Sequence, residues 1–106
     1  MSEPQNEFEE LTESIRQFAV VRDWEKFHTP KNLAMAVAGE AGELVAEFQW
    51  LTAGESERSS LSPEQLNAIG LEIADVQIYL MRLADVLGVK IPDLVREKVS
   101  INEDRF

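Results

Sequence analysis

Apolar residues recur at intervals of three and four along most of this chain, and this helical period limits its fold more than any other feature. It is found in four segments, and no segment alternates apolar and polar residues as a strand does. The expected helices run from about Glu7 to Phe27, from Pro30 to near Gly54, from Pro63 to Gly88 and from about Pro92 to Arg105. Ser62 and Gln65 supply a cap and a capping-box glutamine for the third helix. We therefore expect an all-α, four-helix bundle-like protomer.

The length and charge of the chain restrict its size class and its partners. Its 106 residues, 44% of them hydrophobic, suffice for a single domain over residues 1–106. Because long helices in so short a chain leave a thin core, we expect a homo-oligomer. Twenty acidic residues against ten basic ones disfavour binding to a nucleic acid polymer. The acidic start, the absence of cysteine and the lack of an apolar run of about 20 residues predict a cytoplasmic protein that does not bind membranes.

Carboxylates interrupt the apolar face of the second predicted helix. At about 100° of rotation per residue, Glu40 falls between Val37 and Leu44, in the middle of the face that we expect to be buried. Glu43 and Glu47 lie on one edge of the same face. Side chains at that edge can still point toward a neighbouring helix.

The third predicted helix shows the same interruption more sharply. Its segment 69-IGLEIADVQIYLM-81 is apolar almost all round, which predicts a buried helix, yet it contains Glu72 and Asp75. Together with Tyr79 these residues follow i, i+3, i+7 spacing, so all of them share one stripe of the helix.

Buried carboxylates destabilise a fold unless a partner offsets their charge. Arg22 and Arg82 lie on the stripes of their helices but are too few to neutralise the whole cluster. A divalent cation can do so, and an all-oxygen ligand set favours Mg²⁺ or Mn²⁺ over zinc or copper. The pattern therefore predicts Mg²⁺-dependent attack on a phosphate ester or anhydride. The alternative is that these acidic residues are solvated or paired in salt bridges.

Other polar and aromatic residues are candidates for substrate contacts. Lys98 and Asn102 interrupt the apolar face of the fourth predicted helix, where a lysine can contact phosphate and an asparagine a sugar or base. Trp24 and Trp50 can stack on a base, although tryptophans more often anchor packing. His28 is expected in a loop, where it either caps the chain or contacts a base edge.

These residues resemble a known family. The pattern 40-EAGE-43 followed by 72-EIAD-75 is similar to the E-x-x-E…E-x-x-D signature of the MazG-like, all-α nucleoside triphosphate pyrophosphatases. Four longer segments resemble motifs of the dCTP pyrophosphatase branch: 22-RDWEKFHTPKNLA-34, 39-GEAGELVAEFQW-50, 72-EIADVQIYL-80 and 96-REKVSINEDRF-106. The resemblance extends from the first predicted helix to the end of the chain.

The resemblance implies roles for individual residues. The implied Mg²⁺ ligands are Glu40, Glu43, Glu72 and Asp75. The implied substrate contacts are Trp24, His28, Trp50, Tyr79, Lys98 and Asn102. Glu47 is outside the signature, and Ile15 stands where some relatives carry a histidine near the base, which leaves base selectivity open. The resemblance also implies a homotetramer built as a dimer of dimers.

The expected reaction is hydrolysis of a deoxynucleoside triphosphate, dCTP or a modified dCTP, to the monophosphate and pyrophosphate. We assign the role of general base to Glu43. One alternative is a related helical pyrophosphatase that acts on dUTP or phosphoribosyl-ATP. Another is a non-catalytic helical interaction module whose carboxylates are paired across an oligomer interface.

Overall fold

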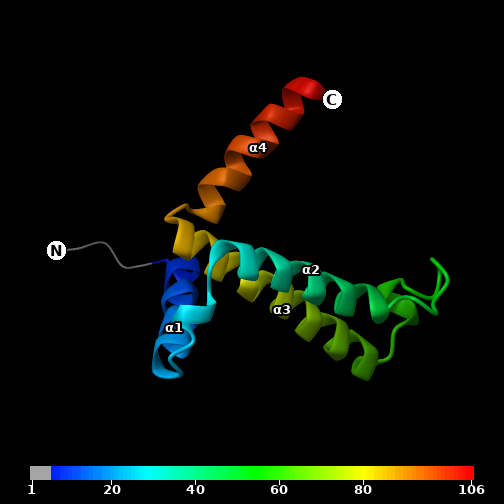
Figure 1. The fold of residues 1–106 in the computed structure, drawn as a ribbon. Helices are drawn as coiled ribbons and strands as arrows, with labels where there is room; N and C mark the ends of the chain where they lie inside the picture. The colour runs from blue at the N-terminus through cyan, green and yellow to red at the C-terminus, as the bar shows by residue number, and fades with distance from the viewer. Residues whose placement is uncertain (1–5) are drawn as a thin grey trace. The chain divides into compact units, whose positions relative to one another are not determined.

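A computed structural model of the protein describes residues 6–106 and consists of helices and their connections (Figure 1). The α-helices are α1 (Glu7–Val21), α2 (Pro30–Ala46), α3 (Pro63–Leu87) and α4 (Ile91–Arg105). Two short 3-10 helices, η1 (Glu25–Phe27) and η2 (Arg58–Ser60), lie in the connections. No strand is present between residues 6 and 106. The all-α prediction is therefore confirmed.

The described residues divide into two compact units. The first unit contains residues 6–30 and 81–106, and the second unit contains residues 31–80. In the second unit α2 and the first part of α3 form an antiparallel pair, joined by the connection that contains η2 (Figure 1). The expectation of a single domain stays a prediction.

Two of the helices have side-chain caps at their first turn, where backbone N–H groups lack partners within the helix. The Oδ1 atom of Asn6 accepts a hydrogen bond of 2.9 Å from the backbone N–H of Glu9 in α1. At α3 the backbone N–H of Gln65 donates to Ser62 Oγ at 3.1 Å, and the backbone N–H of Ser62 donates to Gln65 Oε1 at 2.9 Å. This pair of bonds confirms the predicted capping box.

Helix α1 ends six residues earlier than expected, so the prediction that it continues to Phe27 was wrong. Asp23 adopts a positive φ of 57°, which no α-helix accommodates. The N–H of Asp23 donates to the carbonyl of Val20, and the N–H of Trp24 donates to that of Ala19. These bonds form a Schellman ending, a motif that usually has glycine where this chain has aspartate. Because the usual glycine is absent, the end of this helix could not be predicted from the sequence.

Helix α2 ends at Ala46, and the prediction that it continues to near Gly54 was also wrong. The backbone N–H groups of Glu47 and Phe48 donate to carbonyls only three residues back, at 3.2 and 2.9 Å. The chain therefore tightens into turns after Ala46. At the end of α3, by contrast, Gly88 has a φ of +72° and supplies the expected glycine stop.

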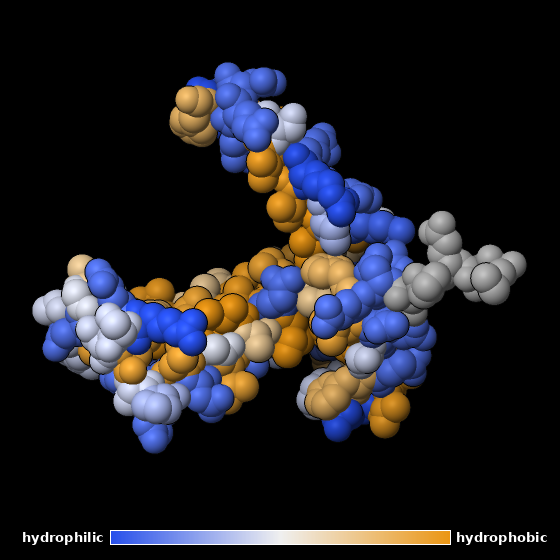
Figure 2. Space-filling view, turned by 180° about the vertical axis from the view of Figure 1, so that it is seen from behind, coloured by the Kyte–Doolittle hydropathy of each residue, from blue (hydrophilic) through white to orange (hydrophobic). Residues whose placement is uncertain are grey.

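The core of the single chain is thin, as expected. The buried hydrophobic residues among those described are Ala19, Leu33, Ile69, Met81 and Ala84. The prediction that segment 69–81 is buried all round was wrong for the single chain, because Leu71 is 60% and Ile73 54% exposed. Extensive apolar surface is visible in Figure 2. A helix within one chain is covered only where a neighbouring helix packs against it.

None of the helices between residues 6 and 106 has the length and apolar character needed to cross a membrane.

Candidate active site

Three of the predicted metal ligands lie together in the second unit. Glu40 reaches inward from α2, and Glu72 and Asp75 reach from α3, where i, i+3 spacing sets them one turn apart. One carboxylate oxygen of each residue lies within 4.8 Å of the others. All three side chains are half-buried. The antiparallel pairing of α2 with α3 therefore joins the two acidic motifs into one cluster.

The electrostatics of this cluster centre on Glu72. Its Oε2 atom is buried and has no hydrogen-bond partner among the described residues. Burial raises the pKa of Glu72 above its ordinary value of 4.5, and repulsion from Asp75, then Glu40, Glu43 and Glu47, raises it further. The second unit thus concentrates negative charge around an oxygen that no residue between 6 and 106 pairs.

These observations fit a metal site. A buried carboxylate oxygen without a donor has a lone pair available for a cation, and a cation would relieve the repulsion that raises the Glu72 pKa. The converging donors are carboxylate oxygens from two helices. Such a set suits a hard divalent ion. The cluster of Glu40, Glu72 and Asp75 can therefore hold a divalent metal ion.

The remaining predicted residues of the second unit lie around this cluster. Glu43 and Glu47 are exposed, and both are near enough to act on the Glu72 pKa. Glu47 follows the end of α2 and lies in the turns beyond it. Tyr79 is half-buried on α3, one turn after Asp75. The roles predicted for Glu43 and Tyr79 stay predictions.

The two tryptophans have different surroundings. Trp50, in the turns after α2, is 87% exposed, so within its own unit it is not a packing anchor. Trp24, in the first unit, packs edge-to-face on Phe18 with 5.6 Å between ring centroids. The Arg22 guanidinium lies 3.5 Å from the centroid of Phe18 and also donates to the Phe18 carbonyl. Trp24 therefore has a packing role as well as a predicted role in stacking.

His28, Lys98 and Asn102 belong to the first unit. His28 follows η1, as the loop prediction required, and is half-buried. Burial lowers the pKa of its imidazole, the Arg82 charge lowers it further, and Glu25 acts in the opposite direction. Lys98 is exposed and Asn102 half-buried on α4. Their predicted contacts with substrate stay predictions.

The sequence pattern did not reveal the partners of Arg82. Its position on the stripe of the third predicted helix makes Arg82 a candidate counter-charge for the carboxylate cluster, but its hydrogen bonds go to Asp85 and His28. Asp85 also accepts two hydrogen bonds of 2.8 Å from Arg16. The i, i+3 spacing of Arg82 and Asp85 was the available signal for one of these contacts.

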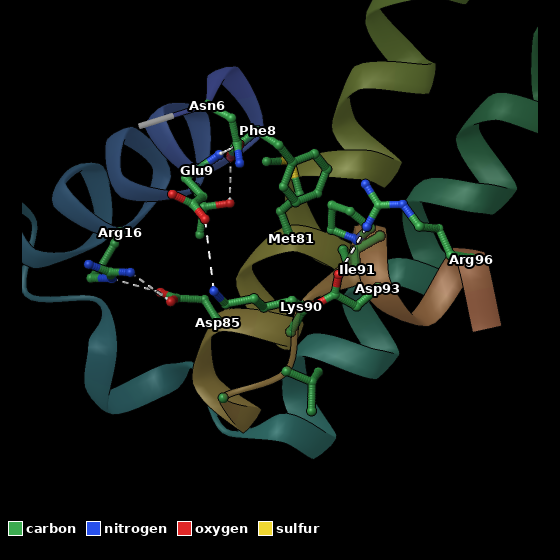
Figure 3. Close-up of a pocket in the computed structure, with 15 residues that line it drawn as sticks. Asn6, Phe8, Glu9, Arg16, Met81, Asp85, Lys90, Ile91, Asp93 and Arg96 are labelled. Carbon is green, nitrogen blue, oxygen red and sulfur yellow. Dashed lines mark hydrogen bonds and ion pairs between the residues drawn. The ribbon is translucent and has the colours of Figure 1, made fainter. Parts of the chain in front are cut away.

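A pocket of about 480 Å³ lies in the first unit, between α1, the end of α3 and the start of α4 (Figure 3). Phe8, Met81 and Ile91 provide apolar walls. Its charged side chains neutralise one another in pairs: Arg16 with Asp85, Lys90 with Glu9, and Arg96 with Asp93. None of the predicted site residues lines it. We therefore do not assign this pocket to the active site.

The acidic cluster lies within a region that matches a known protein family. Residues 36–106, which include Glu40, Glu72 and Asp75, match the MazG-like family. This chain belongs to the MazG-like family. The match covers α2 from residue 36 onward and the whole of α3, the two helices that carry the carboxylates. Both acidic motifs of this MazG-like chain thus lie within the region that matches the family.

A solved structure resembles this MazG-like chain over its whole length. It is the crystal structure of a pyrophosphatase from Archaeoglobus fulgidus, 36% identical in sequence, with a TM-score of 0.89. The match covers 100% of this chain and 97% of the other. The helical fold of this chain is therefore similar to that of a solved pyrophosphatase structure.

Curated relatives of the MazG-like chain come from mammals. The dCTP pyrophosphatase 1 of Homo sapiens is 42% identical over 103 residues, and that of Rattus norvegicus is 38% identical over 103 residues. Each match covers 97% of this chain. The chain spans 61% of the length of these relatives.

Proposed function

We propose that this MazG-like chain hydrolyses a deoxynucleoside triphosphate, dCTP or a modified dCTP, to the monophosphate and pyrophosphate. The observation that carries the proposal is the cluster of Glu40, Glu72 and Asp75, with the unpaired Oε2 atom of Glu72 at its centre. The choice of substrate rests on the similarity to proteins named dCTP pyrophosphatase 1. The reaction class is further supported by the similarity to a pyrophosphatase structure.

The residues proposed to hold the metal ion are Glu40, Glu43, Glu72 and Asp75, and the ion proposed is Mg²⁺, with Mn²⁺ as a substitute. When bound, such an ion supplies neutralisation of the polyphosphate charge and of the charge that develops on the leaving pyrophosphate. The chain itself contributes a fixed array of acceptors, because α2 and α3 hold their carboxylates at helical spacing.

We propose that Glu43 is the general base. Its carboxylate is exposed at the edge of the cluster, where it can accept a proton from an attacking water molecule. The water oxygen then forms a bond to the α-phosphorus, and the bond between this phosphorus and the oxygen that bridges to the β-phosphate breaks. The leaving group is intact pyrophosphate, and no nucleoside diphosphate is formed.

The proposed contacts with the nucleotide come from aromatic and polar side chains. Trp24 and Trp50 would stack on the base, because an aromatic face binds any base by stacking. Four other side chains are proposed to contact the substrate. His28 would contact the base edge, Lys98 a phosphate, and Asn102 the sugar or base. Tyr79 is the fourth proposed substrate contact.

Turnover of dCTP in isotopically labelled water tests the proposed bond cleavage. We expect the label in the nucleoside monophosphate and unlabelled pyrophosphate as the second product, because water attacks the α-phosphorus. Mass spectrometry of both products measures this. A dCTP analogue with a methylene bridge between the α- and β-phosphorus is the control, and it should give no product. Label in released orthophosphate would mean stepwise terminal hydrolysis and would contradict the proposal.

Replacement of Trp50 by alanine tests the proposed base pocket. We expect KM for dCTP to rise roughly 5- to 150-fold, the equivalent of about 1–3 kcal/mol of stacking, with a smaller change in kcat. Steady-state kinetics measure both constants. Phe106→Ala, at an aromatic residue that is 94% exposed and outside the proposed site, is the matched control. Equal kinetics in the two variants would place the base elsewhere.

We further propose that copies of the chain assemble, as a homotetramer. The support is the exposed apolar surface that the single chain leaves on several helices, including one side of α4 (Figure 2). The exposed apolar residues of α4 are Leu94, Val95, Val99 and Ile101. Association would remove this surface from water. Light scattering of the purified protein measures the copy number, and a monomer would refute the assembly.

A further inference from the structure

Arg82 is the buried charged residue of the first unit, and its hydrogen bonds connect two other side chains. The residue is 6% exposed. Its Nε atom donates to His28 Nδ1 at 3.1 Å, and its NH1 group donates to Asp85 Oδ2 at 2.9 Å. His28 and Arg82 are 54 positions apart in the sequence. The buried guanidinium of Arg82 therefore determines whether His28 Nδ1 donates or accepts a hydrogen bond.

The donor character of arginine decides the protonation state of His28. A guanidinium has N–H donors and no acceptor, so His28 Nδ1 must present a lone pair to it. A neutral imidazole has one N–H, which here is carried on Nε2. An imidazolium would place two donors and two positive charges against each other. The lowered pKa of His28, caused by burial and by Arg82, agrees with this conclusion.

The orientation of Arg82 is set from its other side. Asp85 accepts hydrogen bonds from both Arg82 and Arg16, and hydrogen bonds from Arg16 contribute most to lowering its pKa, so it remains charged. Arg82 and Asp85 are one turn apart on α3, which holds the pair at 2.9 Å. Glu25 is the acidic group that acts on His28 in the opposite direction. Asp85 thus holds the Arg82 guanidinium in place beside His28.

We infer that Arg82 is a positioning residue, which holds His28 as the neutral Nε2–H tautomer and so makes it a hydrogen-bond donor to an acceptor atom of the nucleotide base. This inference rests on the proposed function, in which His28 contacts the substrate. A cytosine ring offers such acceptors at its carbonyl oxygen and its unprotonated ring nitrogen. The exocyclic amino group of cytosine is a donor, and His28 Nε2–H does not pair with it. His28 therefore selects for the acceptor side of the base edge.

The tautomer can be measured directly, because His28 is the single histidine of the chain. Long-range proton–nitrogen correlation spectra distinguish the two ring nitrogens without nucleotide or metal. In the parent protein we expect the Nε2–H form at pH values above 6.5, the ordinary pKa of histidine, since the His28 pKa is lowered from that value. In Arg82→Met we expect a mixture of both tautomers and a His28 pKa that returns toward 6.5. An Nδ1–H form in the parent protein would overturn the inference, whatever the variants do.

Arg16→Met is the matched control. It removes one guanidinium from Asp85, as Arg82→Met does, but leaves the bond between Arg82 and His28 in place. We expect the His28 tautomer and the KM for dCTP to be unchanged in this control. If Arg82→Met does not fold, Arg82→Lys provides the second comparison, because lysine retains the positive charge beside Asp85. The spectrum of the parent protein still decides the tautomer.

Kinetics test whether the Nε2–H group contacts the nucleotide. In Arg82→Met we expect KM for dCTP to rise about tenfold with kcat within about twofold, the size of one lost hydrogen bond. We also expect KM to vary with pH near 6.5, which a purely structural role would not cause. A changed tautomer with an unchanged KM would overturn the contact with substrate. Absence of turnover with every triphosphate would refute the proposed function, while the spectra would still decide the state of His28.

Discussion

Replacement of Glu72 by glutamine should lower kcat/KM for dCTP by about 100- to 1000-fold, the loss that follows removal of one charge-stabilising group. Glutamine keeps the size of the side chain but supplies a neutral carbonyl oxygen. The negative charge that repels Asp75 and Glu40 is removed. We therefore expect the metal-free variant to be as stable as the parent or more stable, since part of the buried repulsion is gone.

Steady-state kinetics and thermal unfolding in the presence of a chelator measure the two effects of this change. Glu57→Gln, the same substitution at an exposed residue outside both helices of the cluster, is the control and should change neither quantity appreciably. Mg²⁺ should raise the unfolding temperature of the parent much more than that of Glu72→Gln. A destabilised variant together with a parent that is indifferent to Mg²⁺ would favour a structural carboxylate and the interaction-module alternative.

Replacement of Asp85 by asparagine should destabilise the protein by about 3–5 kcal/mol, because it leaves the buried charge of Arg82 without its carboxylate. The Arg82 side chain is 7% exposed and that of Asp85 is 16% exposed. The same change also weakens the paired hydrogen bonds that Asp85 accepts from Arg16. Chemical unfolding at a fixed protein concentration measures the difference.

Asp93→Asn is a closely matched control for this prediction. Asp93 also pairs with an arginine three residues away, Arg96, at the same distance of 2.9 Å. The side chains of Arg96 and Asp93 are 75% and 71% exposed, so water and salt screen the pair. We expect a change within about 0.5 kcal/mol. Equal effects of the two substitutions would mean that burial does not strengthen the dependence of the fold on Asp85.

Acid titration adds a second measurement on the same pair of variants. Hydrogen bonds from Arg16 lower the pKa of Asp85 below its ordinary value of 3.8, so the folded state binds this proton less readily than the unfolded state does. The stability contributed by Asp85 is therefore complete above pH 3.8 and is lost as the pH falls toward the lower pKa of the folded state. In Asp85→Asn we expect a smaller loss of stability over this acidic range. An unchanged acid limb would contradict the assignment.

Helix starts and acidic motifs could be predicted from the sequence because local chemistry specifies them. Ser62 and Gln65 form a capping box at the start of α3, and this motif needs only residues three positions apart. The i, i+3 spacing of Glu72 and Asp75 places them on one stripe of any α-helix. The ends of α1 and α2 were less predictable, since Asp23 replaces the usual glycine and the turns after Ala46 lack a strong stop residue.

What the sequence by itself determined was the helical class, the starts of α1, α2 and α3 and the two acidic pairs, because each depends on residues within a few positions of one another. Only the tertiary structure decided which oxygen of the cluster stays unpaired and where Arg82 directs its hydrogen bonds. Glu40 meets Glu72 because α2 and α3 lie antiparallel, and His28 meets Arg82 because the chain returns to it after 54 residues. The interaction between two charged side chains depends on the distance between them, and the sequence spacing specifies that distance only when both lie on the same helix.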